Sequence, residues 1–240
     1  MMNGSNPHRR APFLDRLSPE ARAAFIRLGV RRRYGAGDVL IHEGDHVQEL
    51  VILHDGLVKV TGRLDPDRVS LMDIRIGGDV VGEVAALGVG PRSATVIACR
   101  SMATTVVQRA ELESFLLAHP ETSLALNRLL CERLCRADRL RLELGGYPVS
   151  VRLARVLLEL AESHGRPGSE HRPQDENKRR IDVNLSQSEL AALTASKKDT
   201  VHKELARLRK AGIITTGGSQ TFVRDMTRLR EAALRSGPAA

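Results

Sequence analysis

The chain has few aromatic residues and no long apolar run. Its 240 residues include four Phe, two Tyr and no Trp, which argues against RNA-binding modules that stack bases on aromatic side chains. No run of about 18 apolar residues occurs, so the sequence predicts no membrane span. Residues 1–11 hold two arginines but no apolar segment follows them, so no secretory signal is predicted.

Cysteine is also scarce. Cys99, Cys131 and Cys135 are odd in number and lack the spacing of zinc ligands or of a redox CxxC pair. We therefore expect a reduced, cytoplasmic protein with no metal or haem. Cys131 and Cys135 stand one helical turn apart, and we expect them to pack a dimerisation helix rather than to sense redox state or metal.

Positive charge is abundant and unevenly placed. Lys and Arg number 37 against 29 Asp and Glu, which gives a formal net charge of +8. Residues 1–145 account for +2 of this charge and residues 146–240 for +6. The excess predicts a polyanionic partner that binds the C-terminal part of the chain.

Short β-branched runs separated by turn residues dominate the first half. A helix is expected over residues 19–29, with Ser18 as its N-cap and Pro19 as its first residue. Strands are then predicted at residues 39–41, 50–53, 57–60, 69–76, 93–98 and 103–107. Strands this short, with glycine turns between them, predict a small β-barrel or sandwich rather than βαβ units.

Helical spacing begins near Ala110, and after Pro120 leucines recur to Leu144. One face repeats in alternating steps of four and three residues, through Leu126, Leu130, Arg133, Ala137, Leu140 and Leu144. Such a seam favours pairing with the same helix of a second copy in a homodimer. The alternative is a helix packed on its own barrel.

The segment 145–148 (Gly-Gly-Tyr-Pro) predicts a hinge after this helix. A further helix is expected to follow it, with Val149, Leu153, Val156, Leu157 and Leu160 on one face. Residues 163–180 contain no apolar side chain, which predicts a flexible, solvated loop.

Two capping boxes, ten residues apart, indicate a DNA-binding motif. Ser186 with Glu189, and Ser196 with Asp199, each place a serine three residues before an acid at the start of an apolar stretch. Two helices this close predict a helix-turn-helix, and a hairpin expected over residues 213–223 makes it a winged helix. The polar face of the second helix then suits the major groove, where lysine donates to guanine and aspartate accepts from cytosine. An ordinary solvated face is the alternative.

Residues 78–96 are rich in glycine and hold one arginine. A short helical turn is expected at residues 82–87, where its free amides could meet an anion. Arg92 and Ser93 precede an apolar strand, so Arg92 is expected beside the barrel interior. A guanidinium there requires an anion. Glu83 can accept a hydrogen bond from a hydroxyl. One anion and one hydroxyl suit a sugar phosphate, but an ion pair between Arg92 and Glu83 also satisfies both residues.

The segments Gly82-Glu-Val-Ala85 and Pro91-Arg-Ser-Ala-Thr95 resemble the phosphate-binding cassette of cyclic-nucleotide-binding domains. Together with Leu40-Ile-His-Glu-Gly-Asp45, the long helix and Ser196-Lys-Lys-Asp-Thr-Val-His-Lys203, they make residues 12–235 resemble the CRP/FNR family of bacterial transcription regulators. The resemblance implies an α+β protein in three parts. These are a jelly-roll, cyclic-nucleotide-binding-like β-barrel (12–120), a dimerisation helix (121–145) and a winged helix-turn-helix domain (149–235).

The resemblance also implies roles for individual residues. A cyclic nucleotide such as cAMP is the implied ligand: Gly82 and Ser93 meet its phosphate, Arg92 neutralises it, and Glu83 takes the ribose 2′-hydroxyl. Arg133 falls where cAMP-responsive members place an arginine near the base; an ion pair with an acid is its alternative role. The ligand set is Gly82, Glu83, Val84, Arg92, Ser93, Arg133 and Asp138, and the DNA set is Ser186, Ser188, Lys197, Lys198, Asp199, Thr200, His202 and Lys203.

Two departures from the family pattern leave the ligand and the DNA sequence open. Ala137-Asp138 stands where the cAMP receptor has the adjacent Thr and Ser that contact adenine, so the pattern also allows a different nucleotide, or none. Lys198-Asp199 with Lys203 replaces the commoner Arg-Glu and Arg, and lysine lacks the bidentate fork of arginine. The N-terminal cysteine cluster of iron–sulfur members is missing.

The sequence therefore predicts a homodimeric, ligand-responsive regulator that binds a palindromic operator in double-stranded DNA and works with RNA polymerase. The alternative is a constitutive regulator of the same type with a vestigial pocket. A nucleotide-processing enzyme is disfavoured because no nucleophile–base pair or Walker motif occurs. A subunit that docks on an enzyme is disfavoured because the winged helix would then lack a purpose.

Overall fold

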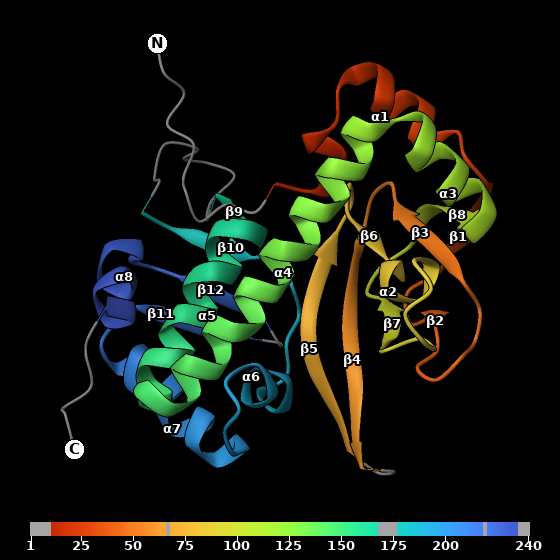
Figure 1. Cartoon of the computed structure of the whole chain (residues 1–240). Helices are drawn as coiled ribbons and strands as arrows, with labels where there is room; N and C mark the ends of the chain where they lie inside the picture. Colours follow the sequence, from red (N-terminus) through yellow and green to blue (C-terminus); the bar gives the residue numbers. More distant parts are fainter. Residues whose placement is uncertain (1–10, 66–67, 168–176, 218–219, 235–240) are drawn as a thin grey trace. The chain divides into compact units, whose positions relative to one another are not determined.

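The computed structural model of the chain describes residues 11–65, 68–167, 177–217 and 220–234 (Figure 1). The chain divides into two compact units, Ala11–Arg136 and a second unit that begins at Ala137. The long helix α4 (Pro120–Gly146) starts in the first unit and ends in the second.

The first unit is built on two four-stranded antiparallel sheets. Their strand orders are β1-β8-β3-β6 and β2-β7-β4-β5. The strands are β1 (Val30–Tyr34), β2 (Val39–Ile41), β3 (Glu49–Leu53), β4 (Leu57–Asp65), β5 (Arg68–Ile76), β6 (Val80–Val81), β7 (Thr95–Ala98) and β8 (Met102–Gln108). Val51, Val58 and Val96 fill the space between the sheets, which confirms the predicted β-architecture.

A second core lies between the β1-β8-β3-β6 sheet and the helices of this unit. These are the 3-10 helix Phe13–Arg16, α1 (Pro19–Ile26), α2 (Glu83–Ala86), α3 (Arg109–Ala118) and the first turns of α4. The Ser18 side chain accepts a hydrogen bond from the amide of Ala21, as its predicted N-cap role requires. Three of the four Phe meet here, and the ring of Phe25 lies 5.5 Å from those of Phe13 and Phe115.

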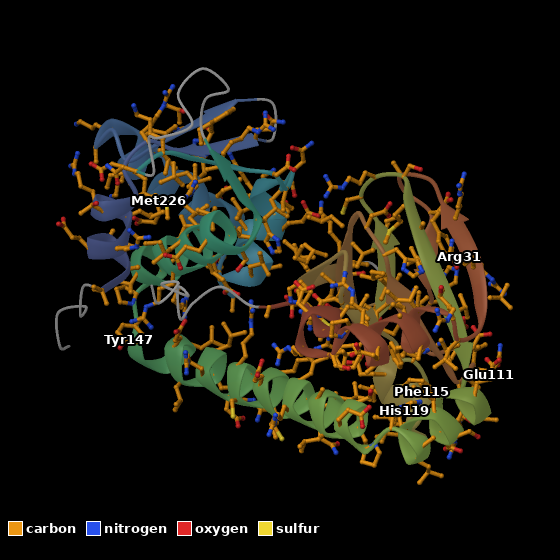
Figure 2. The ribbon with its side chains drawn as sticks, turned by 90° about the horizontal axis from the view of Figure 1, so that it is seen from above. Arg31, Glu111, Phe115, His119, Tyr147 and Met226 are labelled. Carbon is orange, nitrogen blue, oxygen red and sulfur yellow. The ribbon has the colours of Figure 1, made fainter. Side chains whose placement is uncertain are left out.

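The predicted continuous seam on α4 is wrong at its start. Leu126 is only 2% exposed and belongs to the core of its own unit, which is the packing named above as the alternative. Farther along, Leu134, Leu140 and Leu144 are exposed. The helix also continues through residues 145 and 146, so its break begins at Tyr147, which Figure 2 labels at that end of α4.

All three cysteines lie in the described part of the chain, where none of them forms a disulfide, and all are exposed. Cys131 and Cys135, which were expected to pack the dimerisation helix, lie on α4 beyond Leu129, the last α4 residue in the core of the first unit. The chain by itself therefore leaves both thiols accessible. Among the residues that the structure describes, no group of three or more His, Cys, Asp or Glu side chains is placed to hold a metal ion.

The second unit contains a helix-turn-helix and a small sheet of order β11-β12-β10-β9. Its elements after α4 are α5 (Val149–His164), β9 (Gly165–Pro167), β10 (Arg179–Ile181), α6 (Gln187–Leu193), α7 (Lys198–Lys210), β11 (Ile214–Gly217), β12 (Gln220–Val223) and α8 (Met226–Leu234). The helices and hairpin of the predicted winged helix are confirmed.

The loop predicted over residues 163–180 is wrong at both ends. Residues 165–167 pair with residues 179–181 as β9 and β10, because backbone pairing in a sheet needs no apolar side chain when Ile181 alone anchors the strand in the core. Residues 168–176 of that loop lie outside the described residues. The last helix, α8, was not predicted from the sequence.

β1 was also missed. Its sequence, Val-Arg-Arg-Arg-Tyr, lacks apolar alternation because the strand lies at the edge of its sheet and is exposed over four positions. Within the described residues, no helix combines the length and apolarity that crossing a membrane requires.

Candidate ligand and DNA-binding sites

Arg92 is held in the loop before β7, and its side chain is directed into the protein. Its amide donates to the carbonyl oxygen of Asp45 at 2.8 Å, and its own carbonyl accepts from the amide of Gly44 at 2.9 Å. The residue is 5% exposed. Its Nη1 donates to the carbonyl oxygens of Glu49 at 2.6 Å and Gly82 at 3.0 Å.

The guanidinium of Arg92 has no carboxylate bonded to it within the described part of the chain. Its two acceptors there are neutral carbonyls, and both bonds use Nη1, so Nε and Nη2 remain as donors. Burial lowers the pKa of Arg92, while Glu49, Asp45 and Glu83 oppose that shift through their charges. A buried cation with two spare donors is the local chemistry that an oxyanion satisfies.

Gly82 brings the backbone against this arginine. It adopts a left-handed conformation, φ +79°, immediately before α2, and the predicted helical turn at 82–87 is confirmed. A Cβ atom at this position would collide with Nη1 of Arg92 and would lie 2.9 Å from the carbonyl oxygen of Glu49. Only glycine fits both the conformation and the space.

Glu83 and Arg133 form an ion pair that ties α4 to the cassette. Arg133 donates from Nη1 to Oε1 of Glu83 and from Nη2 to the carbonyl oxygen of Val80 at 3.0 Å. Of the two roles considered for Arg133, the structure therefore contains the ion pair, within one chain. Glu83 is bonded to Arg133 and not to Arg92, so the simple Arg92–Glu83 pair is not what the structure shows.

The other predicted ligand residues lie in different surroundings. Val84 is half-buried on α2 and Ser93 is exposed beside Arg92. Asp138 is an exposed residue of α4 in the second unit. The structure thus gathers Gly82, Glu83, Arg92 and Arg133. The carbonyl oxygens of Glu49 and Val80, which hold the two arginines, were not predicted because backbone acceptors have no residue signature.

The first predicted capping box is confirmed. Ser186 Oγ accepts from the amide of Glu189 at 3.2 Å, and Glu189 Oε2 accepts from the amide of Ser186 at 2.8 Å. These two bonds fix the start of α6.

The second predicted capping box is wrong. The N-cap of α7 is Lys197, and Ser196 Oγ lies 2.8 Å from Thr194 Oγ1 instead. The physical reason is the turn between α6 and α7, in which Ala195 has φ +43°. This turn places the Ser196 hydroxyl against Thr194 at the end of α6, so the hydroxyl bonds there and does not cap α7.

The polar face of α7 is open to solvent. Val201 and Leu205 are buried against the core of the unit. Among the predicted DNA contacts, Ser186, Ser188, Lys197, Lys198, Asp199, His202 and Lys203 are exposed or partly exposed and Thr200 is partly buried. His202 Nδ1 lies 3.3 Å from Gln187 Oε1, so α6 and α7 meet at the end that would enter a groove.

Replacing Ala195 by Gly is expected to stabilise the chain. A non-glycine residue in the left-handed region costs roughly 1–2 kcal/mol, and glycine removes this cost while adding entropy to the unfolded chain. We expect a net gain of about 0.5–1 kcal/mol in the free energy of unfolding of the second unit, measured by urea denaturation. Ala206→Gly, in the interior of α7, is the control and should lose a similar amount. Destabilisation by Ala195→Gly would contradict the strained turn.

Comparison with known proteins finds similar transcription regulators. A CRP-like cAMP-activated global transcriptional regulator of Mycobacterium tuberculosis is 29% identical over 224 residues, 93% of this chain and 97% of that protein. A solved CRP-family transcriptional regulator from Thermus thermophilus has a TM-score of 0.67 at 26% identity, covering 87% of this chain and 100% of that one. A c-di-GMP responsive global regulator of Xanthomonas campestris has a TM-score of 0.70 at 19% identity, over 86% and 99% of the chains, and shows the fold alone.

Family models match both units. The cyclic nucleotide-binding domain matches residues 31–119, which include the whole cassette, and the Crp-like helix-turn-helix domain matches residues 151–232. Both expected architectures are confirmed, in the expected order. The chain therefore belongs to the CRP/FNR family of DNA-binding transcription regulators, which are not enzymes.

Proposed function

We propose that this regulator works as a homodimer and is controlled by a cyclic nucleotide bound in its first unit. The observation that supports ligand control is Arg92, a buried guanidinium with two spare donors and only carbonyl partners among the described residues. In this proposal Gly82, Ser93 and Arg92 bind the cyclic phosphate, Glu83 accepts from the ribose 2′-hydroxyl, and Val84 lines the cassette. Arg133 and Asp138 contribute from α4, toward the base.

The contact between Arg133 and Glu83 supplies a route from ligand to helix. Arg133 uses Oε1 of Glu83, so a ribose hydroxyl that binds Oε2 would share the same carboxylate. A change at Glu83 then alters the pair that fastens α4 to the cassette. For this contact to act as a switch, the ligand must bind more tightly to the conformation with α4 in one position than to the conformation with α4 in another.

The exposed half of α4 supports the homodimer. Leu134, Leu140 and Leu144 are large apolar side chains that their own chain leaves accessible, and such a face favours burial against the same helix of a second copy. Two α7 helices related by a two-fold axis would read two half-sites about one DNA turn apart, which is a palindromic operator. RNA polymerase is the further partner we propose.

DNase footprinting with titrated cyclic nucleotides tests this function. cAMP is the first ligand to try because the M. tuberculosis relative is described as cAMP-activated, and cGMP follows because Ala137-Asp138 departs from the adenine pattern. We expect a roughly palindromic protected site whose affinity changes when the nucleotide binds. Protection that no nucleotide changes would favour the constitutive alternative, and no protection on any genomic fragment would overturn DNA regulation.

Replacing Lys203 by Ala should reduce the sequence specificity of DNA binding at one base pair. Lys203 is exposed on α7, where an amine donates to guanine O6 or N7, so the change should cost about 1–3 kcal/mol on the preferred site. Lys210→Ala, at the exposed end of the same helix, is the matched control and should weaken all sequences slightly and equally. Gel-shift titrations on sites varied at each position measure both. Unchanged preference in Lys203→Ala would remove its role in base recognition.

A further inference from the structure

A pocket separate from the cassette lies on the β1-β8-β3-β6 sheet, on the face that points away from the other sheet of the first unit. In the register of β1 and β8, Arg33 pairs with Ala103 and Arg31 with Thr105. The amide of His54, just after β3, donates to the carbonyl oxygen of Ala103 at 3.0 Å. Arg33, Ala103 and His54 therefore form one row across three strands, and Figure 2 labels Arg31 near these strands.

The small side chain of Ala103 leaves a hollow in this row. The resulting pocket has a volume of about 540 Å³ and is lined by Arg31, Arg32, Arg33, His54 and Ala103. This volume lies within the range of roughly 300–1,000 Å³ that is usual for small-molecule sites. The pocket shares no lining residue with the cassette around Arg92.

The three arginines of the pocket form no ion pair with the described acidic residues. Residues 11–136 hold equal numbers of basic and acidic side chains, sixteen of each, yet none of the described acids pairs with Arg31, Arg32 or Arg33. Neighbouring guanidinium groups repel one another, and an anion relieves that repulsion. Charged side chains also protect an edge strand from pairing, but that role requires neither the hollow nor His54.

His54 adds a titratable donor to the wall. Its Nε2 lies 2.7 Å from Thr105 Oγ1. Burial lowers the pKa of His54, the charge of Arg31 lowers it further, and Asp55 opposes the shift. Burial and the charge of Arg31 thus favour the neutral imidazole, and a neighbouring anion would raise its pKa.

We propose that this pocket binds a small phosphorylated molecule at a site separate from the nucleotide cassette. Arginine forks recognise phosphoryl oxygens with two parallel hydrogen bonds, and Arg31 and Arg33 point to the same side of their strand because side chains alternate along it. The proposal stands whether or not the cassette binds a cyclic nucleotide.

Calorimetry with inorganic pyrophosphate as the probe tests the site on the full chain, at about 150 mM salt so that diffuse attraction is screened. We expect Arg33→Gln, which removes one fork, and Ala103→Leu, which fills the hollow, each to weaken binding at least tenfold. Arg22→Gln is the matched control, an exposed arginine that pairs with Asp15 on the same unit, and should leave the affinity unchanged. Circular dichroism confirms that each variant is folded.

Arg92→Gln separates the two sites. If pyrophosphate occupied the cassette instead, this variant would lose the binding and the proposal would be wrong. If Arg22→Gln weakened pyrophosphate binding as much as Arg33→Gln, the binding would reflect only diffuse charge and the proposal would be wrong. It would also be wrong if the unmodified chain gave no detectable heat of binding.

The affinity of the pocket for an anion should depend on pH through the protonation of His54. Because a bound anion raises the pKa of His54, affinity should increase, relative to that of His54→Gln, as the pH falls from about 8 to about 6. The charged groups that act on His54 are Arg31 and Asp55. His54→Gln should retain binding and show only the titration of the probe itself. An identical pH profile in both proteins would exclude His54 from the site.

Discussion

Arg92→Gln is expected to remove cyclic-nucleotide binding, with a loss of at least about 100-fold, or about 3 kcal/mol. The amide of glutamine is neutral and too short to occupy the guanidinium position, so a bound phosphate would be buried without its counter-charge. The unliganded fold should tolerate the change, because the bonds lost are two hydrogen bonds to carbonyl oxygens. Calorimetry with cAMP and cGMP measures the loss.

Arg92→Lys separates charge from shape. Lysine retains the positive charge but lacks the fork that bonds to Glu49 and Gly82 together with an anion, so we expect intermediate affinity. DNA binding without nucleotide should stay unchanged in both variants, because the winged helix belongs to the other unit. Full nucleotide affinity in Arg92→Gln would contradict the proposed ligand site, and equal loss in both variants would mean that charge alone is insufficient.

Gly82→Ala is expected to destabilise the first unit by about 3 kcal/mol. A left-handed backbone costs alanine roughly 1–2 kcal/mol. The added Cβ also meets Nη1 of Arg92 and the carbonyl oxygen of Glu49, neither of which can move without breaking the hydrogen bond between them. Overpacking of this kind adds about 1–3 kcal/mol. The free energy of unfolding in urea measures the sum.

Gly37→Ala is the matched control for this substitution. Gly37 also has a positive φ, +90°, but a Cβ there would have no heavy atom of the described residues within 4 Å, apart from its two chain neighbours. We therefore expect a loss of only about 1 kcal/mol, from the backbone conformation alone. The difference between the two variants isolates the steric term, and equal losses would show that the space around Gly82 is not restricted.

Local chemistry explains which features could be predicted from the sequence. The cap at Ser18, the capping box at Ser186 and the glycine turns involve residues a few positions apart, so residue type and spacing suffice. The cassette is likewise nearly contiguous, since Gly82, Glu83, Arg92 and Ser93 lie within twelve residues of one another. The overall architecture and the family followed from such segments in their order along the chain.

The failed predictions share a different cause. Ser196 stands three residues before an acid, yet its hydroxyl bonds to Thr194, because the strained turn at Ala195 decides which partner is near. The seam on α4 fits a heptad over its whole length, but Leu126 packs into the core of its own unit. β1 has the composition of a charged loop, and only pairing with β8 makes it a strand.

The sequence alone determined the order of β-rich unit, long helix and helix-turn-helix, and the glycine-rich turn at Gly82, since each depends on residues close together in the chain. Tertiary structure decided which groups those residues meet. Arg133 bonds to Glu83 across 50 positions, and Arg33 lies in one row with Ala103 and His54 through the sheet register. Partners so distant in sequence are selected by the packing of whole strands and helices, which brings together backbone acceptors and side chains that share no local pattern.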